Sequence, residues 1–138
     1  MTDTFFQQFN GSGIWYVIHI LGLNAKDNKS KRTFVRTINT LADNFGCNKC
    51  KIHMKKFIEN NNLHDYWHIH LPYPNIGFFK WTWELHNDIN KNIGKSVMEL
   101  EDAFQLYTTG ICKNCDDKKY VNKILVPIEE PYFNLKTR

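Results

Sequence analysis

The chain has 138 residues, of which 42% are hydrophobic and 14% aromatic, and this is enough for one domain with a single core. Its net charge of +4 comes from scattered lysines, which argues against nucleic-acid binding, because that needs a continuous basic stripe. The longest apolar-rich stretch, residues 14–23, is interrupted by His19 and is too short to span a membrane. The first residues lack the features of a secretory signal, so we expect a cytoplasmic protein.

Apolar side chains at helical spacing predict the first two helices. Residues 14–23 form the first, whose apolar face is expected to contain Ile14, Val17, Ile18 and Leu21. The apolar face of the second helix consists of Phe34, Ile38, Leu41 and Phe45. The basic cluster at residues 29–32 marks where this helix begins and should be a solvated face. Gly46 should end it, because glycine tolerates a left-handed backbone conformation.

A third helix is expected to start at Cys47 and to run through Met54 and Phe57 to the polar breaker at residues 60–62. Residues 64–75, with two prolines, are expected to form a loop. The histidines in this loop have no carboxylate or cysteine at a recognisable metal-ligand spacing. We therefore expect them to pack in the loop and not to bind a metal.

The fourth helix, about residues 76–93, carries two stripes and should end at Gly94. Its core stripe consists of Phe78, Leu85 and Ile89, and its second stripe of Phe79, Trp83, His86 and Asn90. Residues 96–99 read as a capping box that opens a fifth helix, which should end at Gly110. One side of this fifth helix should be apolar, with Val97, Leu100, Phe104 and Tyr107.

Beyond residue 110 the helical pattern weakens, and Pro127 and Pro131 indicate an extended tail. We therefore predict an all-α fold, a four-helix bundle plus a short fifth helix with an extended C-terminal tail. Residues 1–110 would form the domain, and residues 111–138 the C-terminal segment.

The four cysteines form two C-x-x-C pairs, Cys47/Cys50 and Cys112/Cys115. Without a secretory signal, such pairs are more often metal-binding or redox-active than structural. Cys47 and Cys50 lie at the start of a predicted helix, where they can close a small disulfide ring and where the helix N-terminus stabilises a thiolate. The pair alone fits half of a zinc site, with His53 as third ligand, equally well.

Two stripes of aromatic and polar side chains favour the redox interpretation. One stripe is on the fourth helix (Trp81, Trp83, His86, Asn87 and Asn90), and the other is Trp15 with His19 one turn later. Each stripe alone is more often ordinary core packing. Facing helices of a bundle can, however, hold a planar cofactor between them. A disulfide beside a flavin would move two electrons from thiols toward oxygen.

The order Trp15-x-x-x-His19, Cys47-x-x-Cys50-x-x-His53 and Trp81-x-x-x-x-His86-Asn87-x-Ile89-Asn90, followed by Lys95, resembles the Erv/ALR family of FAD-linked sulfhydryl oxidases. It looks closest to the short forms that large DNA viruses encode, and it covers about residues 13–107. The resemblance implies a four-helix bundle plus a short fifth helix, with FAD bound at one end and commonly a homodimer. A viral protein of this kind would work in the host cytoplasm or the virion.

The resemblance also implies residue roles. Cys50 would face the isoalloxazine and form the charge-transfer thiolate, and Cys47 would be the interchange sulfur that meets the incoming dithiol. The other cofactor-binding positions would be Trp15, His19, His53, Trp83, His86, Asn87, Asn90 and Lys95. Thiol-containing proteins, including a thioredoxin-like carrier, would be the substrates, and oxygen would be reduced to hydrogen peroxide.

The sequence departs from the family pattern in two places. Gly46 precedes the first cysteine, where members often have proline, and this change would loosen the turn without abolishing exchange. We also find no clear match to the widely spaced structural disulfide of many cellular members.

The role of Cys112/Cys115 stays open. The pair follows Gly110 and precedes charged residues 116–119, which favours a mobile shuttle that passes electrons to Cys47. A local staple or a weak metal site is the other interpretation. For the whole chain, the main alternative is a zinc-stabilised interaction module using all four cysteines, although the separation of the pairs exceeds common zinc spacings. A purely structural bundle would leave the order of the motifs unexplained.

Overall fold

A computed structural model describes residues 11–45 and 48–110, and within these ranges all regular structure is helical. The elements are α2 (Gly11–Leu23), α3 (Asn28–Asn44), α4 (Asn48–Asn60), the short 3-10 helix η1 (Leu63–Tyr66), α5 (Gly77–Asn92) and α6 (Leu100–Thr109). The predicted all-α fold, with four main helices and a shorter fifth, is confirmed. The predicted tail and its proline residues lie outside the described residues.

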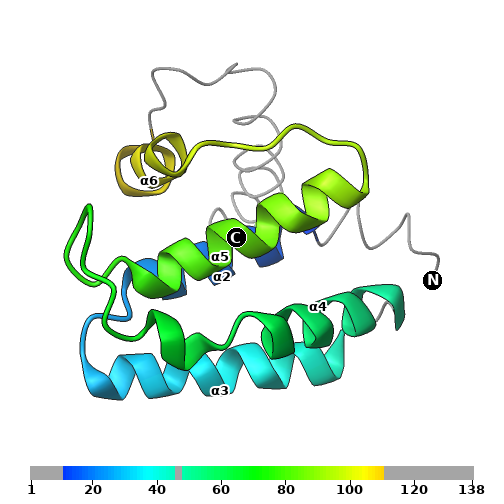
Figure 1. Cartoon of the computed structure of the whole chain (residues 1–138), viewed down its shortest axis with the longest axis horizontal. Coiled ribbons are helices and arrows are strands. Elements are labelled where there is room, and N and C mark those ends of the chain that lie inside the picture. The colour runs from blue at the N-terminus through cyan, green and yellow to red at the C-terminus, as the bar shows by residue number, and fades with distance from the viewer. Residues whose placement is uncertain (1–10, 46–47, 111–138) are drawn as a thin grey trace, which may run out of the picture.

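The helices are arranged in layers, with α2 and α5 between the α3–α4 pair and α6 (Figure 1). Neighbouring helices in the bundle run antiparallel. As a result, α2 and α4 begin, and α3 and α5 end, at the same end of the bundle, on the right in Figure 1. Among the described helices, none has both the length and the apolar character that crossing a bilayer requires.

Most of the core is aromatic and lies between α3, α4 and α5. Phe34 stacks on Phe78, and Trp81 packs edge-on against both Phe34 and Phe57. The indole N–H of Trp81 donates to the carbonyl of Asn61 at 2.8 Å, so the buried ring leaves no polar atom unsatisfied. A second, smaller cluster lies under α6 and contains Ile76, Phe79 and Ala103.

Helices α2 and α5 approach each other closely at Gly22. A Cβ at this position would lie 3.1 Å from the Phe78 carbonyl oxygen and 3.1 Å from the Phe79 nitrogen, which are backbone atoms and cannot move aside cheaply. The absence of a side chain at Gly22 thus sets the distance between the two helices. It places the residues one and two turns earlier on α2 directly against α5.

The predicted apolar face of α2 is right for Ile14 and Ile18, which pack in the core, and wrong for the other two positions. Ile18 is buried (2% exposed), but Val17 and Leu21 are 54% and 37% exposed, while the polar His19 is 1% exposed. The reason is that α2 meets α5 along the line through Trp15, His19 and Gly22. Side chains four and seven residues apart share a helical face, so this polar line lies inside.

Two local predictions also need correction. The basic cluster at residues 29–32 is not wholly solvated, because Lys31 is only 6% exposed. The Lys31 Nζ donates to the carbonyl of Trp67 at 2.7 Å and to Asn75 Oδ1 at 3.2 Å. This buried ammonium ties the start of α3 to the 67–75 loop, which is a tertiary contact that no local pattern indicates.

The second correction concerns α6, which begins at Leu100 and not at residue 96. Residues 96–99 do not open this helix as predicted, because they are not helical; Glu99 is the N-cap of α6 and makes no side-chain capping bond. The capping box that does exist precedes α3, where Asp27 accepts from the Ser30 nitrogen at 2.7 Å. Gly94 and Gly110 both have φ of 73°, as expected of helix-ending glycines. Gly46 lies outside the described residues.

Candidate functional site

Of the two cysteines in the predicted redox pair, only Cys50 lies within the described residues. Cys50 is the third residue of α4 and is partly buried, whereas Cys47 lies outside the described residues. Met54 and Phe57, which share a helical face with Cys50, are both buried, so Cys50 is on the side of α4 that faces the bundle. It also lies at the N-terminal end of its helix, where the backbone favours a thiolate.

Trp15, His19 and His86, which are far apart in the sequence, come together between α2 and α5. The rings of Trp15 and His86 stack with centroids 4.0 Å apart and an interplanar angle of 4°. His19 lies beside both rings, and its Nε2 is 3.0 Å from His86 Nδ1. His19 and His86 lie in the middle part of their helices, and Trp15 lies one turn before His19, toward the end of the bundle at which α2 and α4 begin (Figure 1).

Both imidazoles are held neutral. Burial, and secondly the neighbouring His86, lowers the pKa of His19 well below its usual range. Burial, together with the positive charge of Lys95, lowers the pKa of His86 to about 4. The other ring nitrogen of His19 is 2.8 Å from the Thr82 hydroxyl, which itself donates to the carbonyl of Phe79 at 2.7 Å.

Tyr107, on α6, covers this group of rings. Its ring centroid lies 4.4 Å from that of His19. The Tyr107 hydroxyl is buried and has no hydrogen-bond partner within the described part of the chain. Burial also raises the pKa of this phenol, so it stays protonated and keeps a hydrogen to donate.

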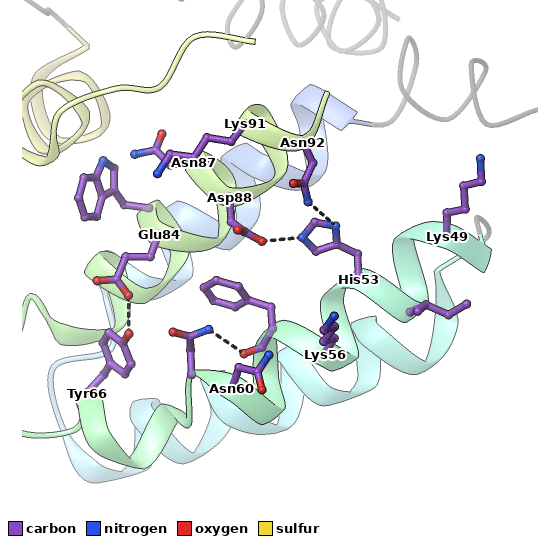
Figure 2. Close-up of a pocket in the computed structure, with 14 residues that line it drawn as sticks. Lys49, His53, Lys56, Asn60, Tyr66, Glu84, Asn87, Asp88, Lys91 and Asn92 are labelled. Carbon is purple, nitrogen blue, oxygen red and sulfur yellow. Dashed lines mark hydrogen bonds and ion pairs between the residues drawn. The ribbon is translucent and has the colours of Figure 1, made fainter. Parts of the chain in front are cut away.

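An open cleft between α4 and α5, with a volume of about 860 Å³, is lined by three of the remaining predicted positions, His53, Trp83 and Asn87 (Figure 2). The other predicted positions in the described part of the chain do not line it: Trp15, His19, Cys50, His86, Asn90 and Lys95. His53, on α4, crosses to α5, with its Nε2 2.7 Å from Asp88 Oδ2 and its Nδ1 3.3 Å from Asn92 Nδ2. Aromatic, amide and basic side chains line the cleft, including Phe57, Trp83, Asn60, Asn87, Lys49, Lys56 and Lys91. Tyr66 donates to the carboxylate of Glu84 at one end.

Trp83 and Asn87 also attach the chain after α5. Asn87 makes two hydrogen bonds with the backbone of Met98: its Oδ1 accepts from Met98 N at 3.0 Å, and its Nδ2 donates to Met98 O at 2.9 Å. Trp83 Nε1 donates to the same carbonyl at 2.6 Å. Asn90 is in the last turn of α5, where its carbonyl accepts from the Lys95 nitrogen at 2.8 Å.

A comparison of the sequence with models of known protein families identifies the family of this chain. A sequence model described as the Erv1 / Alr family matches residues 12–108. The chain belongs to the Erv1/Alr family. This finding confirms the resemblance that the motifs indicated, while the closeness to viral short forms stays a prediction. No curated protein and no solved structure gives a significant match to the chain. The Erv1/Alr family is known for FAD-linked sulfhydryl oxidases.

The types of side chain in this Erv1/Alr protein match the chemical groups of FAD. A flavin nucleotide needs flat apolar walls for its rings, hydrogen-bond partners for their edges and positive charge for its phosphates. The stack of Trp15 on His86 supplies a flat aromatic surface, and the cleft supplies amides and lysines. The size of the cleft falls within the range that holds small-molecule cofactors. In the described part of the chain, no group of three or more His, Cys, Asp or Glu side chains is placed to hold a metal ion.

The structure adds residues to the site that the sequence did not indicate. Thr82 lies behind His19, Asp88 orients His53, and Tyr107 covers His19. Asp88 is in the motif-bearing helix and could have been noticed at position i+2 from His86. Thr82 carried no signal, because threonine in a helix interior is common and its partner is 63 residues away. Cys112 and Cys115 lie outside the described residues.

Proposed function

We propose that this protein is an FAD-dependent thiol oxidase that transfers electrons from dithiols through Cys47–Cys50 to FAD and then to oxygen. The observation that carries the proposal is the match to the Erv1/Alr family together with the position of Cys50. Cys50 lies in the first turn of α4, on the side of that helix that faces the bundle, and α4 begins at the end of the bundle at which α2, the helix of Trp15, also begins. A cysteine on an exposed face or at the opposite end would not support this function.

The thiol chemistry is a two-step exchange. A substrate thiolate attacks Cys47 Sγ, the Cys47–Cys50 bond breaks, and Cys50 leaves as a thiolate that the N-terminus of α4 stabilises. The second substrate thiol loses its proton and attacks the mixed disulfide. The substrate disulfide is then complete, and both cysteines of the enzyme are reduced. FAD, when bound, accepts the two electrons of the reduced pair and passes them to oxygen, which gives hydrogen peroxide.

The side chains around the pair have supporting roles. The neutral His19 and His86 keep a buried positive charge away from the ring stack. Lys49, Lys56 and Lys91 would hold the phosphates of the cofactor on the open side of the cleft. His53 links α4 to α5 through Asp88, which would fix the first turns of α4 and hence the position of Cys50.

Oxygen consumption tests the proposal. The purified protein should be yellow, and dithiothreitol should drive oxygen uptake with formation of hydrogen peroxide. Cys50→Ser should lose this turnover, because Cys47 then has no partner with which to form the disulfide that the substrate thiolate attacks. A colourless protein that binds no added FAD, contains stoichiometric zinc and unfolds with a chelator would refute the oxidase and support the zinc module.

We also propose that Cys112/Cys115 is a shuttle pair that collects electrons from protein substrates. The double variant Cys112→Ala/Cys115→Ala serves as both test and control for Cys50→Ser. It should keep its turnover with dithiothreitol, which is small enough to reach Cys47 directly. With a protein dithiol such as reduced thioredoxin, its turnover should fall. Unchanged turnover with the protein substrate would refute the shuttle and leave a local staple or a weak metal site.

A further inference from the structure

Thr82, His19 and His86 form a hydrogen-bonded chain in which every proton position is fixed. The Thr82 hydroxyl has one hydrogen, and it donates this hydrogen to the carbonyl of Phe79 at 2.7 Å. It has none left for His19 Nδ1, which is 2.8 Å from the same oxygen. His19 Nδ1 must therefore be the donor in that bond, and Thr82 the acceptor.

The next bond follows from the first. His19 is neutral, because its ring is buried and its pKa is far below the usual range, so it carries a single proton. With that proton on Nδ1, its Nε2 has only a lone pair. The hydrogen bond between His19 Nε2 and His86 Nδ1, at 3.0 Å, must then be donated by His86.

The end of the chain is the second nitrogen of His86. His86 is also neutral, and its proton is used on Nδ1, so its Nε2 is a bare acceptor. In the part of the molecule that the structure describes, no group donates to this atom. As a whole residue His86 is partly exposed, and its ring lies flat against Trp15, which fixes the orientation of the ring.

We infer that Thr82 is a positioning residue that acts through His19 to make His86 Nε2 a hydrogen-bond acceptor for a ring N–H or amino group of the cofactor. The inference rests on the proposed FAD-binding function. FAD carries such a donor on both of its ring systems, the imide N–H of the isoalloxazine and the amino group of the adenine. A ligand group that presents only a lone pair at this position would be rejected.

Replacing Thr82 tests the direction of the chain. Thr82→Val keeps the shape of the side chain but removes the acceptor for His19 Nδ1–H. Since a buried N–H without a partner is costlier than a buried lone pair, the proton of His19 should move to Nε2, and that of His86 should then move to its own Nε2. Thr82→Ser keeps the hydroxyl and is the matched control.

Nitrogen-15 NMR of histidine-labelled protein reads these protons directly, without any activity measurement. In the wild type and in Thr82→Ser, Nδ1 should be protonated and Nε2 bare in both His19 and His86. In Thr82→Val, the His86 signal should show a protonated Nε2. A wild type with a protonated His86 Nε2, or a Thr82→Val variant with unchanged ring protonation, would overturn the inference.

Binding titrations test whether the cofactor uses the acceptor. FAD should bind about tenfold more weakly to Thr82→Val than to Thr82→Ser, which is the cost of one lost hydrogen bond. FMN, which lacks the adenine, identifies the donor: the same loss for FMN points to the isoalloxazine, and no loss points to the adenine. Equal FAD affinities, with the ring protons rearranged, would refute the use of His86 as an acceptor. Failure of all three proteins to bind FAD would instead refute the proposed function, and the NMR result would still stand.

Discussion

At position 31 a lysine is buried because its ammonium group satisfies two oxygens of the 67–75 loop. The Nζ also lies 5.8 Å from the centroid of the Trp67 ring, within the range of a cation–π contact. A single side chain thus holds the loop against the start of α3.

Replacing this lysine with an apolar residue should destabilise the fold. Lys31→Met fills similar space but leaves the carbonyl of Trp67 without this donor, so the free energy of unfolding should fall by about 1–3 kcal/mol. Lys29→Met, at an exposed position in the same turn, should change it by less than about 0.5 kcal/mol. Urea denaturation of the two variants measures the difference. Equal effects would mean that the Lys31 contacts contribute nothing.

The neutral histidines make stability depend on pH. In the unfolded chain a histidine has a pKa near 6.5, but His86 has a pKa of about 4 in the fold, and that of His19 is also lowered. Between these values the unfolded state binds more protons than the folded state, so the free energy of unfolding should fall as the pH drops from about 6.5 toward 4. Urea midpoints measured across this range would show the slope. His86→Gln should reduce it, whereas His68→Gln, at an exposed position, should leave it unchanged.

The sequence indicated which of these residues lie together, but it did not indicate the contacts that hold them in place. Trp15, His19 and His86 were predicted to share a site, and the structure brings them together. Lys31 and Thr82 were missed because each acts through a partner 36 or more positions away. Such pairings follow from helix packing, and no spacing within a single helix reveals them.

Gly13 and Gly22 of helix α2 differ in their surroundings and so provide a matched pair of substitutions. Gly22→Ala would force a Cβ to within 3.1 Å of the α5 backbone, and the helices would have to separate. We expect a loss of about 1–3 kcal/mol in the free energy of unfolding, as for other overpacked interfaces. The change should also loosen the contact of Trp15 with His86.

Gly13→Ala is the control, because a Cβ there meets nothing within 4 Å. It should stabilise the protein by roughly 0.5–1 kcal/mol, since alanine favours the helix more than glycine does. Thermal denaturation followed by circular dichroism would compare the two. If Gly22→Ala were as harmless as Gly13→Ala, the close approach of α2 and α5 would be in doubt.

The predictions for α5 and α6 differed in accuracy for a physical reason. The apolar period of α5 and its terminal glycine placed this helix to within a residue at each end. The start of α6 was placed four residues too early, because residues 96–99 carry a local helix-start signal that tertiary contacts override. Trp83 and Asn87 bind Met98, which keeps this stretch extended.

For the whole molecule, cofactor binding should be coupled to folding. FAD would contact side chains from α2, α4 and α5, which adjoin one another only in the folded state. At a free FAD concentration one hundred times the dissociation constant, the free energy of unfolding should rise by about 2.7 kcal/mol. Thermal midpoints measured at increasing FAD concentrations, with NAD as a control nucleotide, would show this. A midpoint insensitive to FAD would contradict the proposed site.

The side-chain amide of Asn87 pairs with the backbone of Met98 as one peptide group pairs with another in a β-sheet. Its oxygen accepts from the Met98 N–H, and its amino group donates to the Met98 carbonyl. The attachment of the α5–α6 connection is therefore sensitive to a single atom. If the amide were hydrolysed to aspartate, as happens to asparagine during chemical ageing, an oxygen would replace the amino nitrogen and face the Met98 carbonyl, so that attraction would become repulsion. Slow deamidation at this position would weaken the attachment of Met98 to α5, leaving the bond from Trp83 and the apolar contacts of α6 to hold this connection.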